Sequence, residues 1–298
     1  MNKLRKGLYD TRSVGALYSA ATVFVVFASL IFSIMLAGIG FTRPQEGESY
    51  PDWYLYLSFI LPQAAFALAG ALFFVFTDAK PREVYRAPKL RYILLAILLQ
   101  FGLFSISRLN ELFLAFLYDV FGYTSNVTLP SMENGGIVGV IFVVALLPAL
   151  MEESIFRGLL LPPLKKLSTP IAVLLCGGLF ALYHGSPAQT VYQFCCGAAF
   201  AFMAIRANSV LPTMISHFLN NTAIIVFTFY GINSFPLWVY ILAGVVLVGC
   251  LVYLIFFDKE SNTKKTESAK PFLWTASIGI AICGILWVSN LLSGIIQG

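Results

Sequence analysis

Charged residues are scarce in this 298-residue sequence: 11% are Asp, Glu, Lys or Arg, whereas 59% are hydrophobic. The mean hydropathy is +0.83. A soluble domain of this size has too little interior for so much apolar side chain. Repeated apolar runs of about 20 residues predict an all-α fold, a polytopic transmembrane helix bundle. The strands of a membrane barrel would alternate polar and apolar residues, and these runs do not.

Several signatures of catalysis and of metal binding are also missing. The sequence contains no GxSxG and no HExxH motif, and Ser154 and Ser216 lack the surroundings of a known nucleophile. The five cysteines lie in apolar runs without paired metal-ligand spacing, so we interpret them as small core residues. The net charge of +5 comes from loops, and we expect no nucleic-acid partner.

The apolar runs predict about eight to nine membrane helices, and nine is the favoured number. The first run is too long for a signal peptide, so we expect it to be retained as a helix. We treat residues 1–298 as a single membrane domain with N-terminal helices one to three (1–134), a core of helices four to seven (135–230) and C-terminal helices eight and nine (231–298). The nine runs are 14–40, 53–76, 91–119, 136–161, 169–185, 188–206, 210–230, 235–257 and 272–295.

The distribution of lysine and arginine supports this helix map. Sixteen of the 19 basic residues fall in the N-terminus and in alternate connections, at 77–91, 165–166, 206 and 259–270. Cytoplasmic loops of membrane proteins are enriched in Lys and Arg. We therefore predict a multi-pass cell-membrane protein with a cytoplasmic N-terminus and an external C-terminus.

Charged residues inside one apolar run indicate a functional site. Glu152, Glu153 and Arg157 follow an uncharged stretch that begins at residue 135. Each charge at the centre of a membrane helix costs about 2.5–3.5 kcal/mol, so it needs a local partner or a use. Glu153 and Arg157 are spaced i,i+4 and can neutralise each other. The ion pair alone also fits a structural alternative, in which both glutamates only hold the bundle together.

The chain's only two histidines also lie in apolar runs. His184 ends the run 169–185, whereas His217 and Asn221 lie one helical turn apart on another. A desolvated glutamate can act as a general base, and a histidine can hold the water that it activates. A second histidine and an amide can donate to a developing oxyanion. These residue types fit a hydrolase that uses water as its nucleophile.

Three motifs in order resemble one known family. EExxxR occurs at Glu152–Arg157, FxxxH at Phe180–His184 and HxxxN at His217–Asn221. This combination resembles the CPBP family of intramembrane proteases (CAAX proteases and bacteriocin-processing enzymes, also called Abi), which includes the type II CAAX prenyl endopeptidases. The resemblance covers residues 135–230. Each motif alone is weak, and their order on predicted membrane helices makes the signal strong.

The resemblance implies a role for each motif residue. Glu152 would activate water with His184 as its partner, and His217 and Asn221 would form an oxyanion hole. Glu153 and Arg157 would be supports that fix the helix and the charge balance. The resemblance implies a glutamate mechanism without a cofactor. Zinc remains the less favoured alternative, because two histidines and a glutamate can bind it, although Asn221 is a poor zinc ligand.

Three classes of function remain open from the sequence. The favoured one is an intramembrane endopeptidase that acts on a peptide or membrane-protein substrate in the lipid bilayer. The alternative is a non-catalytic bacteriocin-immunity or scaffold protein on the same fold, which would not need a base and oxyanion donors together. A proton-coupled transporter is the third, but the two halves show no repeat.

Overall fold

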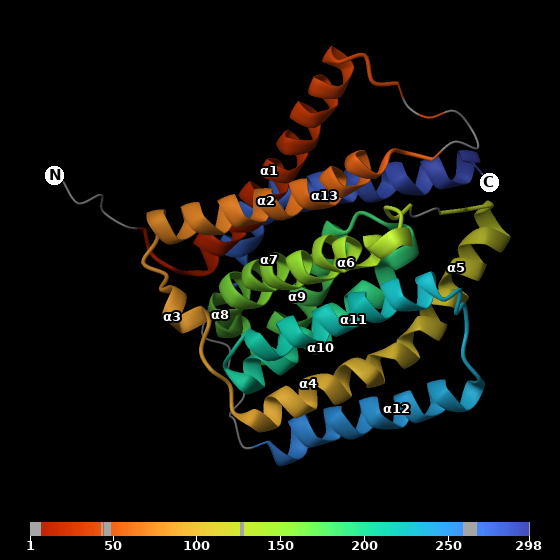
Figure 1. Ribbon diagram of the computed structural model, residues 1–298. Coiled ribbons are helices and arrows are strands. Elements are labelled where there is room, and N and C mark those ends of the chain that lie inside the picture. The colour runs from red at the N-terminus through yellow and green to blue at the C-terminus, as the bar shows by residue number, and fades with distance from the viewer. Residues whose placement is uncertain (1–6, 43, 45–48, 126–127, 259–266, 298) are drawn as a thin grey trace.

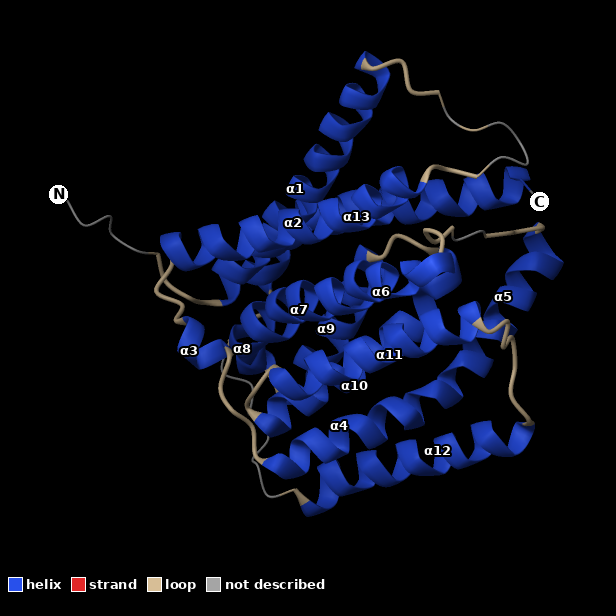
Figure 2. Cartoon of the chain, in the orientation of Figure 1, coloured by secondary structure: helices blue, strands red, loops and turns tan. Residues whose placement is uncertain are grey.

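The computed structural model describes residues 7–42, 44, 49–125, 128–258 and 267–297, and all regular elements within them are helices (Figure 2). Seven stretches of the described chain are long and apolar enough to cross a membrane. Two further helices are α9 (Thr169–Tyr183) and α11 (Leu211–Phe229). Those seven are Thr11–Gly38, Asp52–Phe76, Leu90–Phe121, Glu133–Leu167, Pro187–Ala207, Leu237–Phe257 and Lys270–Ile296. All nine predicted runs are therefore helical, and the all-α bundle is confirmed.

Several long spans are composed of shorter helices. The first two and the last are α1 (Thr11–Gly38), α2 (Asp52–Phe76) and α13 (Lys270–Gln297), and the short α3 (Pro81–Val84) follows α2. The third span is α4 (Leu90–Leu103), the 3₁₀ turn η1 (Phe104–Ile106) and α5 (Ser107–Phe121). The others include α10 (Thr190–Ala207) and α12 (Leu237–Val252), which continues into the π-helical η7 (Tyr253–Phe257).

The fourth span is the most irregular and passes through the middle of the bundle (Figure 1). It consists of η2 (Glu133–Gly135), α6 (Gly136–Val140), η3 (Ile141–Leu146), α7 (Leu147–Glu153), η4 (Ser154–Leu160), α8 (Leu161–Leu164) and η5 (Lys165–Leu167). It contacts α2 on one side and α11 on the other. Helices α1, α2 and α13 lie together beyond one side, and α4 and α12 pack together beyond the other (Figure 1).

Helices α1 and α13 run parallel to each other. Ser19 Oγ donates to the carbonyl of Thr275 (2.7 Å), and the Thr22 hydroxyl lies 3.8 Å from Cys283 Sγ, so residue numbers rise together along both helices. A first and a last helix with the same direction fit the predicted odd number of crossings. The placement of the N-terminus on the cytoplasmic side of the membrane stays a prediction.

Segments distant in the sequence meet at one end of the bundle, which we call the basic end (7–10, 77–91, 165–168, 206–210 and 267–270). Tyr9 donates to the carbonyl of Leu159 (2.7 Å), and Ser209 Oγ donates to the carbonyl of Arg86 (2.5 Å). Glu267 pairs with Lys166 at 3.0 Å. The described basic loop residues are therefore gathered as predicted, whereas Lys3, Arg5, Lys6, Arg43, Lys259, Lys264 and Lys265 lie outside the described residues.

The outer surface of the bundle is apolar. Ile34 on α1, Phe256 on η7 and Trp274 on α13 are 62%, 75% and 80% exposed. Large side chains exposed at this level suit contact with acyl chains rather than with water. The long apolar helices and this surface define a multi-pass membrane protein.

The interpretation of the cysteines as core residues needs one correction. All five thiols are free, and Cys176, Cys196, Cys250 and Cys283 are buried, but Cys195 is only half-buried. Cys195 and Cys196 are neighbours on α10 and point about 100° apart around the helix, so only one of them faces the core.

Candidate active site

The fourth span is loosened on both sides of the two glutamates. Proline lacks an N–H, so Pro148 leaves the carbonyl of Val144 without its usual helical donor. Asn221 on α11 fills this role, because its side-chain Nδ2 donates to the carbonyl of Val144 at 2.8 Å. The π-helical segments η3 and η4 flank α7, which carries Glu152 and Glu153. The regular α-helical hydrogen bonding is therefore interrupted around Pro148.

Glu153 links the fourth span to α11. Arg157 Nη1 donates to Glu153 Oε1 at 2.8 Å, as the i,i+4 spacing predicts, and His217 Nδ1 lies 3.0 Å from the same oxygen. The three side chains are buried, with residue exposures of 0% for Glu153, 2% for Arg157 and 4% for His217. A buried carboxylate between a guanidinium and an imidazole is electrostatically compensated, which makes its burial tolerable.

Arg157 is held by more than its ion pair. Its Nη2 donates to the carbonyl of Gly197 on α10 at 3.0 Å, and its guanidinium lies 4.2 Å from the Phe180 ring centroid and 5.5 Å from that of Phe200. Such cation–π contacts stabilise a desolvated charge. Helices α9 and α10 approach closely here, because Gly177 and Gly197 face each other without side chains.

Glu152 points to a different set of partners. Its Oε1 accepts a hydrogen bond of 2.9 Å from Gln63 Nε2 on α2, and its Oε2 lies 4.0 Å from His184 Nε2. Glu152 is 5% exposed, and Oε2 has no hydrogen-bond partner in the described part of the chain. A buried carboxylate oxygen is costly to leave without a donor, so this oxygen is suited to bind a water or a substrate group.

The hydrogen bond of His184 fixes its neutral tautomer. His184 follows the last residue of α9, and its Nδ1 lies 2.7 Å from the carbonyl of Phe180. A carbonyl can only accept, so Nδ1 carries the hydrogen and Nε2 presents a lone pair toward Glu152. The imidazole rings of His184 and His217 both pack edge-on against Phe180, with centroid separations of 4.6 and 5.9 Å.

A further network of side-chain hydrogen bonds is centred on Asn220, next to Asn221 on α11. Asn220 Oδ1 accepts from Gln100 Nε2 on α4 (2.8 Å) and from the Tyr192 hydroxyl on α10 (2.7 Å), while Asn220 Nδ2 donates to Asn221 Oδ1 (2.9 Å). The amide of Asn221 is thereby oriented from both ends, and one hydrogen on its Nδ2 remains for another acceptor.

Gln63, Gln100, Tyr192 and Asn220 were not among the residues predicted from the sequence. One signal could have found the two glutamines, since amide side chains are rare within apolar membrane helices. No spacing rule indicates that Gln63 contacts Glu152, because the two residues lie 89 positions apart. Arg108 and Glu111 form an exposed ion pair on α5.

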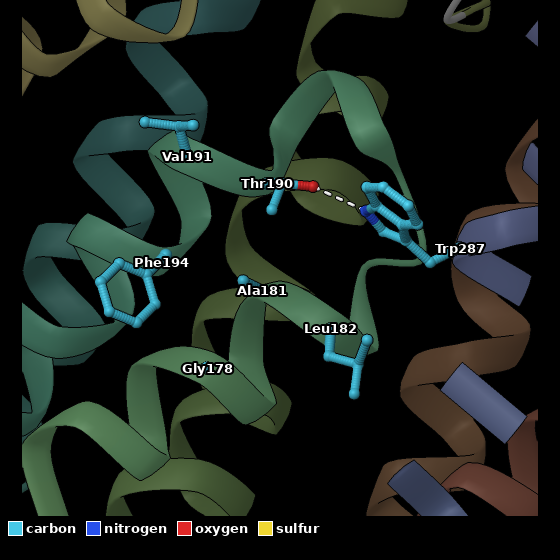
Figure 3. A pocket seen from close by; sticks show the side chains of 7 residues that line it. All are labelled: Gly178, Ala181, Leu182, Thr190, Val191, Phe194 and Trp287. Atoms are coloured by element: carbon cyan, nitrogen blue, oxygen red, sulfur yellow. Dashed lines mark hydrogen bonds between the residues drawn. The ribbon is translucent and has the colours of Figure 1, made fainter. Parts of the chain in front are cut away.

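An apolar cleft of about 370 Å³ lies beside α9 (Figure 3). Ala181 and Leu182 line it together with Phe194 of α10 and Trp287 of α13, and Trp287 donates to the Thr190 hydroxyl at 2.8 Å. The residues that line the cleft include none of Glu152, Glu153, His184, His217 and Asn221. The cleft is therefore separate from the polar site.

The polar groups form two separate acid–imidazole pairs. Glu152 faces His184, and Glu153 contacts His217. Within the described residues, no group of three or more His, Cys, Asp or Glu side chains is placed to hold a metal ion. Whether catalysis needs a metal stays a prediction that chelation tests.

The comparison with known protein families identifies the same segment. Residues 134–223, less than a third of the 298-residue chain, match the family described as "Type II CAAX prenyl endopeptidase Rce1-like". No curated protein and no solved structure matches the chain. The match confirms that this segment resembles the CPBP family of CAAX-type intramembrane endopeptidases.

Proposed function

We propose that this protein hydrolyses peptide bonds with a water molecule activated by Glu152 and His184. The observation that carries the proposal is the 4.0 Å separation of Glu152 Oε2 and His184 Nε2. Both atoms can accept a hydrogen bond. A water that donates hydrogen bonds of about 2.8 Å to two acceptors spans roughly 4.4 Å between them. The pair is therefore spaced to hold one water by both of its O–H bonds.

In the proposed reaction, Glu152 takes one proton from the water and later gives it to the leaving group. The water oxygen attacks the carbonyl carbon while Glu152 takes a water proton at Oε2 and His184 holds the second O–H. The resulting tetrahedral oxyanion accepts hydrogen bonds from His217 and Asn221. Glu152 then passes its proton to the leaving nitrogen as the C–N bond breaks, which restores the carboxylate.

The contact between Glu153 and His217 determines which protonation state His217 needs in order to donate to the oxyanion. His217 Nδ1 donates to the Glu153 carboxylate, so a second donor at Nε2 exists only in the imidazolium form. Glu153 balances the charge of that form, and Arg157 orients Glu153. Glu153 and Arg157 are thus proposed as positioning residues rather than as groups that touch the substrate.

We further propose a cell-membrane location with the basic end toward the cytoplasm. The grouping of Lys and Arg at this end supports that orientation. A cysteine-labelling experiment on intact and permeabilised cells tests it, with a cysteine introduced at Arg82. Labelling only after permeabilisation agrees with the orientation, whereas labelling of intact cells contradicts it.

The proteolytic activity is tested with purified protein, a peptide library and mass spectrometry. We expect site-specific cleavage that persists after strong chelation, because every proposed role belongs to a protein side chain: a carboxylate, two imidazoles and the Asn221 amide. Loss of cleavage on chelation, with recovery by zinc alone, would contradict the metal-independent mechanism. Absence of any cleavage with both peptides and membrane-protein substrates would favour the non-catalytic alternative.

Gln63 is expected to position Glu152 for the reaction. Gln63→Met should lower kcat by about tenfold or more with little change in KM, because a hydrogen bond to a charged group is worth about 1.5–3 kcal/mol. The matched control is Gln193→Met, which removes a side-chain contact to Gln189 outside the site. Equal kcat in the Gln63→Met variant and the wild type would remove Gln63 from this role.

A further inference from the structure

The hydrogen bonds around Asn221 allow only one orientation of its side-chain amide. The Val144 carbonyl can only accept, so the Asn221 atom that lies 2.8 Å from it is Nδ2. The other amide atom, Oδ1, accepts from Asn220 Nδ2 at 2.9 Å. A flipped Asn221 amide would place its oxygen against the Val144 carbonyl and its nitrogen against the nitrogen of Asn220, so both hydrogen bonds would be lost.

Asn220 is oriented in turn by two donors that converge on its oxygen. Gln100 Nε2 on α4 donates to Asn220 Oδ1 at 2.8 Å, and the Tyr192 hydroxyl on α10 donates to the same atom at 2.7 Å. Because the oxygen is held by these two donors, Asn220 presents its nitrogen to Asn221. We call Gln100, Tyr192 and Asn220 the Asn220 network. Its donors and acceptors alternate without conflict as far as the amide of Asn221.

The Asn220 network is kept inside the bundle at a cost in stability. Gln100 and Asn220 are buried, and Gln100 Oε1 has no hydrogen-bond partner within the described residues. A buried polar atom without a partner is destabilising, so a function is a reason to retain it. Asn221, at the end of the network, is only half-buried. Hydrogen bonds that follow one another in a site of low dielectric also polarise one another, which strengthens the last donor.

The backbone of Tyr192 is held as well as its side chain. Its N–H donates to Asn110 Oδ1 at 3.2 Å, and Asn110 Nδ2 donates to the carbonyl of Ala188 at 2.7 Å. Asn110 on α5 thereby ties down the start of α10, from which the Tyr192 side chain reaches Asn220. The Tyr192 hydroxyl is therefore a fixed donor, and its removal leaves the ring and the backbone contacts in place.

We propose that the Asn220 network positions the amide of Asn221 as a donor to the oxyanion. This positioning role rests on the proposed function, in which Asn221 Nδ2 donates to the tetrahedral intermediate. Nδ2 carries two hydrogens, and the Val144 carbonyl takes one, so the second is the one that remains for the oxyanion. Without the donor from Asn220, the amide can turn and present Oδ1, which would repel the developing negative charge.

Tyr192→Phe tests the network with the smallest change, the loss of one hydroxyl. Removal of a whole oxyanion donor costs about 10²–10³ in kcat, so a donor that is only misoriented should cost less, about three- to tenfold. KM should change little, because the lost interaction forms in the transition state. Asn220→Leu removes the donor to Asn221 itself and should lower kcat by about tenfold or more. The matched control is Tyr9→Phe, which also removes a hydroxyl with a hydrogen bond of 2.7 Å, here to the Leu159 carbonyl near the basic end, and should leave kcat unchanged.

A stable mimic of the tetrahedral intermediate separates positioning from a general loss of structure. The probe is the phosphinate analogue of the best library peptide, which carries a negative oxygen in the place of the oxyanion. Its inhibition constant should rise in the Tyr192→Phe variant by the factor by which kcat/KM falls, whereas inhibition by the cleaved product peptides should be unchanged. Equal weakening of both inhibitors would show that the hydroxyl supports only the packing of the site.

The coupling between Tyr192 and Asn221 decides the inference. Asn221→Ala should lower kcat by about 10²-fold, and the addition of Tyr192→Phe should cause no further loss, because the amide that the network positions is gone. Unchanged kcat in Tyr192→Phe and Asn220→Leu, or the same Tyr192→Phe loss with and without the Asn221 side chain, overturns the positioning role and leaves the proposed function in place. Unchanged kcat in the Asn221→Ala variant removes the oxyanion role of Asn221, and the positioning role with it.

Discussion

Glu152→Gln is expected to lower kcat by about 10³-fold while the protein still inserts and folds. The substitution keeps the size of the side chain and a side-chain oxygen that can accept from Gln63, but it removes the group that takes the proton from water. General base catalysis contributes about 10²–10⁴-fold, and Oε2 is the atom that faces His184. The measurement is steady-state cleavage of the best library peptide, with the midpoint of thermal unfolding as the check of folding.

Glu111→Gln is the matched control for this loss. Glu111 is an exposed glutamate that pairs with Arg108 on α5, far in sequence from the site, and its amide should leave kcat unchanged. His184→Ala should reduce kcat as strongly as Glu152→Gln, because it removes the second acceptor for the water. Full activity of the Glu152→Gln variant would remove Glu152 from the role of base.

Arg157→Met is expected to lower the free energy of unfolding by about 3–5 kcal/mol, because it leaves the Glu153 carboxylate buried without its guanidinium. Both side chains of this pair are fully buried, whereas those of the Arg108–Glu111 pair are 51% and 44% exposed. Arg108→Met should therefore cost less than about 1 kcal/mol. Denaturant titration of both variants in the same detergent measures the two free energies.

A double variant separates the stability of this pair from its role at the site. Glu153→Leu combined with Arg157→Met removes both buried charges and should recover most of the lost stability, since apolar replacements of buried pairs are often neutral. Cleavage should stay lost, because His217 no longer has a carboxylate to balance its imidazolium form. Recovery of cleavage together with stability would show that the pair supports only the fold.

The local features of the fold were predictable, because they depend on composition along one stretch of chain. The apolar runs predict eight of the nine helices within a few residues, and Glu153 and Arg157 form the ion pair that their spacing predicts. The predicted end of the fourth run at residue 161 is wrong, because the helix continues through Pro162 and Pro163 to Leu167. Pro148 predicts a weakened helix, and its effect is visible at the Val144 carbonyl. The interruption of the third span at η1 has no comparable signal, since residues 104–106 contain no proline or glycine.

Contacts between distant helices were not predictable in the same way. The motifs identified Glu152 and His184, but the approach of Gln63 depends on how α2 packs on the fourth span. The contact of His217 with Glu153 follows from the position of α11, and it adds a protonation requirement to the oxyanion role. The roles of the six motif residues remain predictions. The structure places four of them in two acid–imidazole pairs, while Arg157 donates to Glu153 and Asn221 donates to the Val144 carbonyl.

The central claim is that Glu152 and His184 act on one water as a unit, and a double-mutant cycle tests it most directly. The cycle compares kcat for Glu152→Gln, His184→Ala and the two substitutions combined. Residues that act as a unit give strongly non-additive losses. We predict that the double variant is no less active than the weaker single variant. A double variant whose loss equals the product of the two single losses would contradict the shared water.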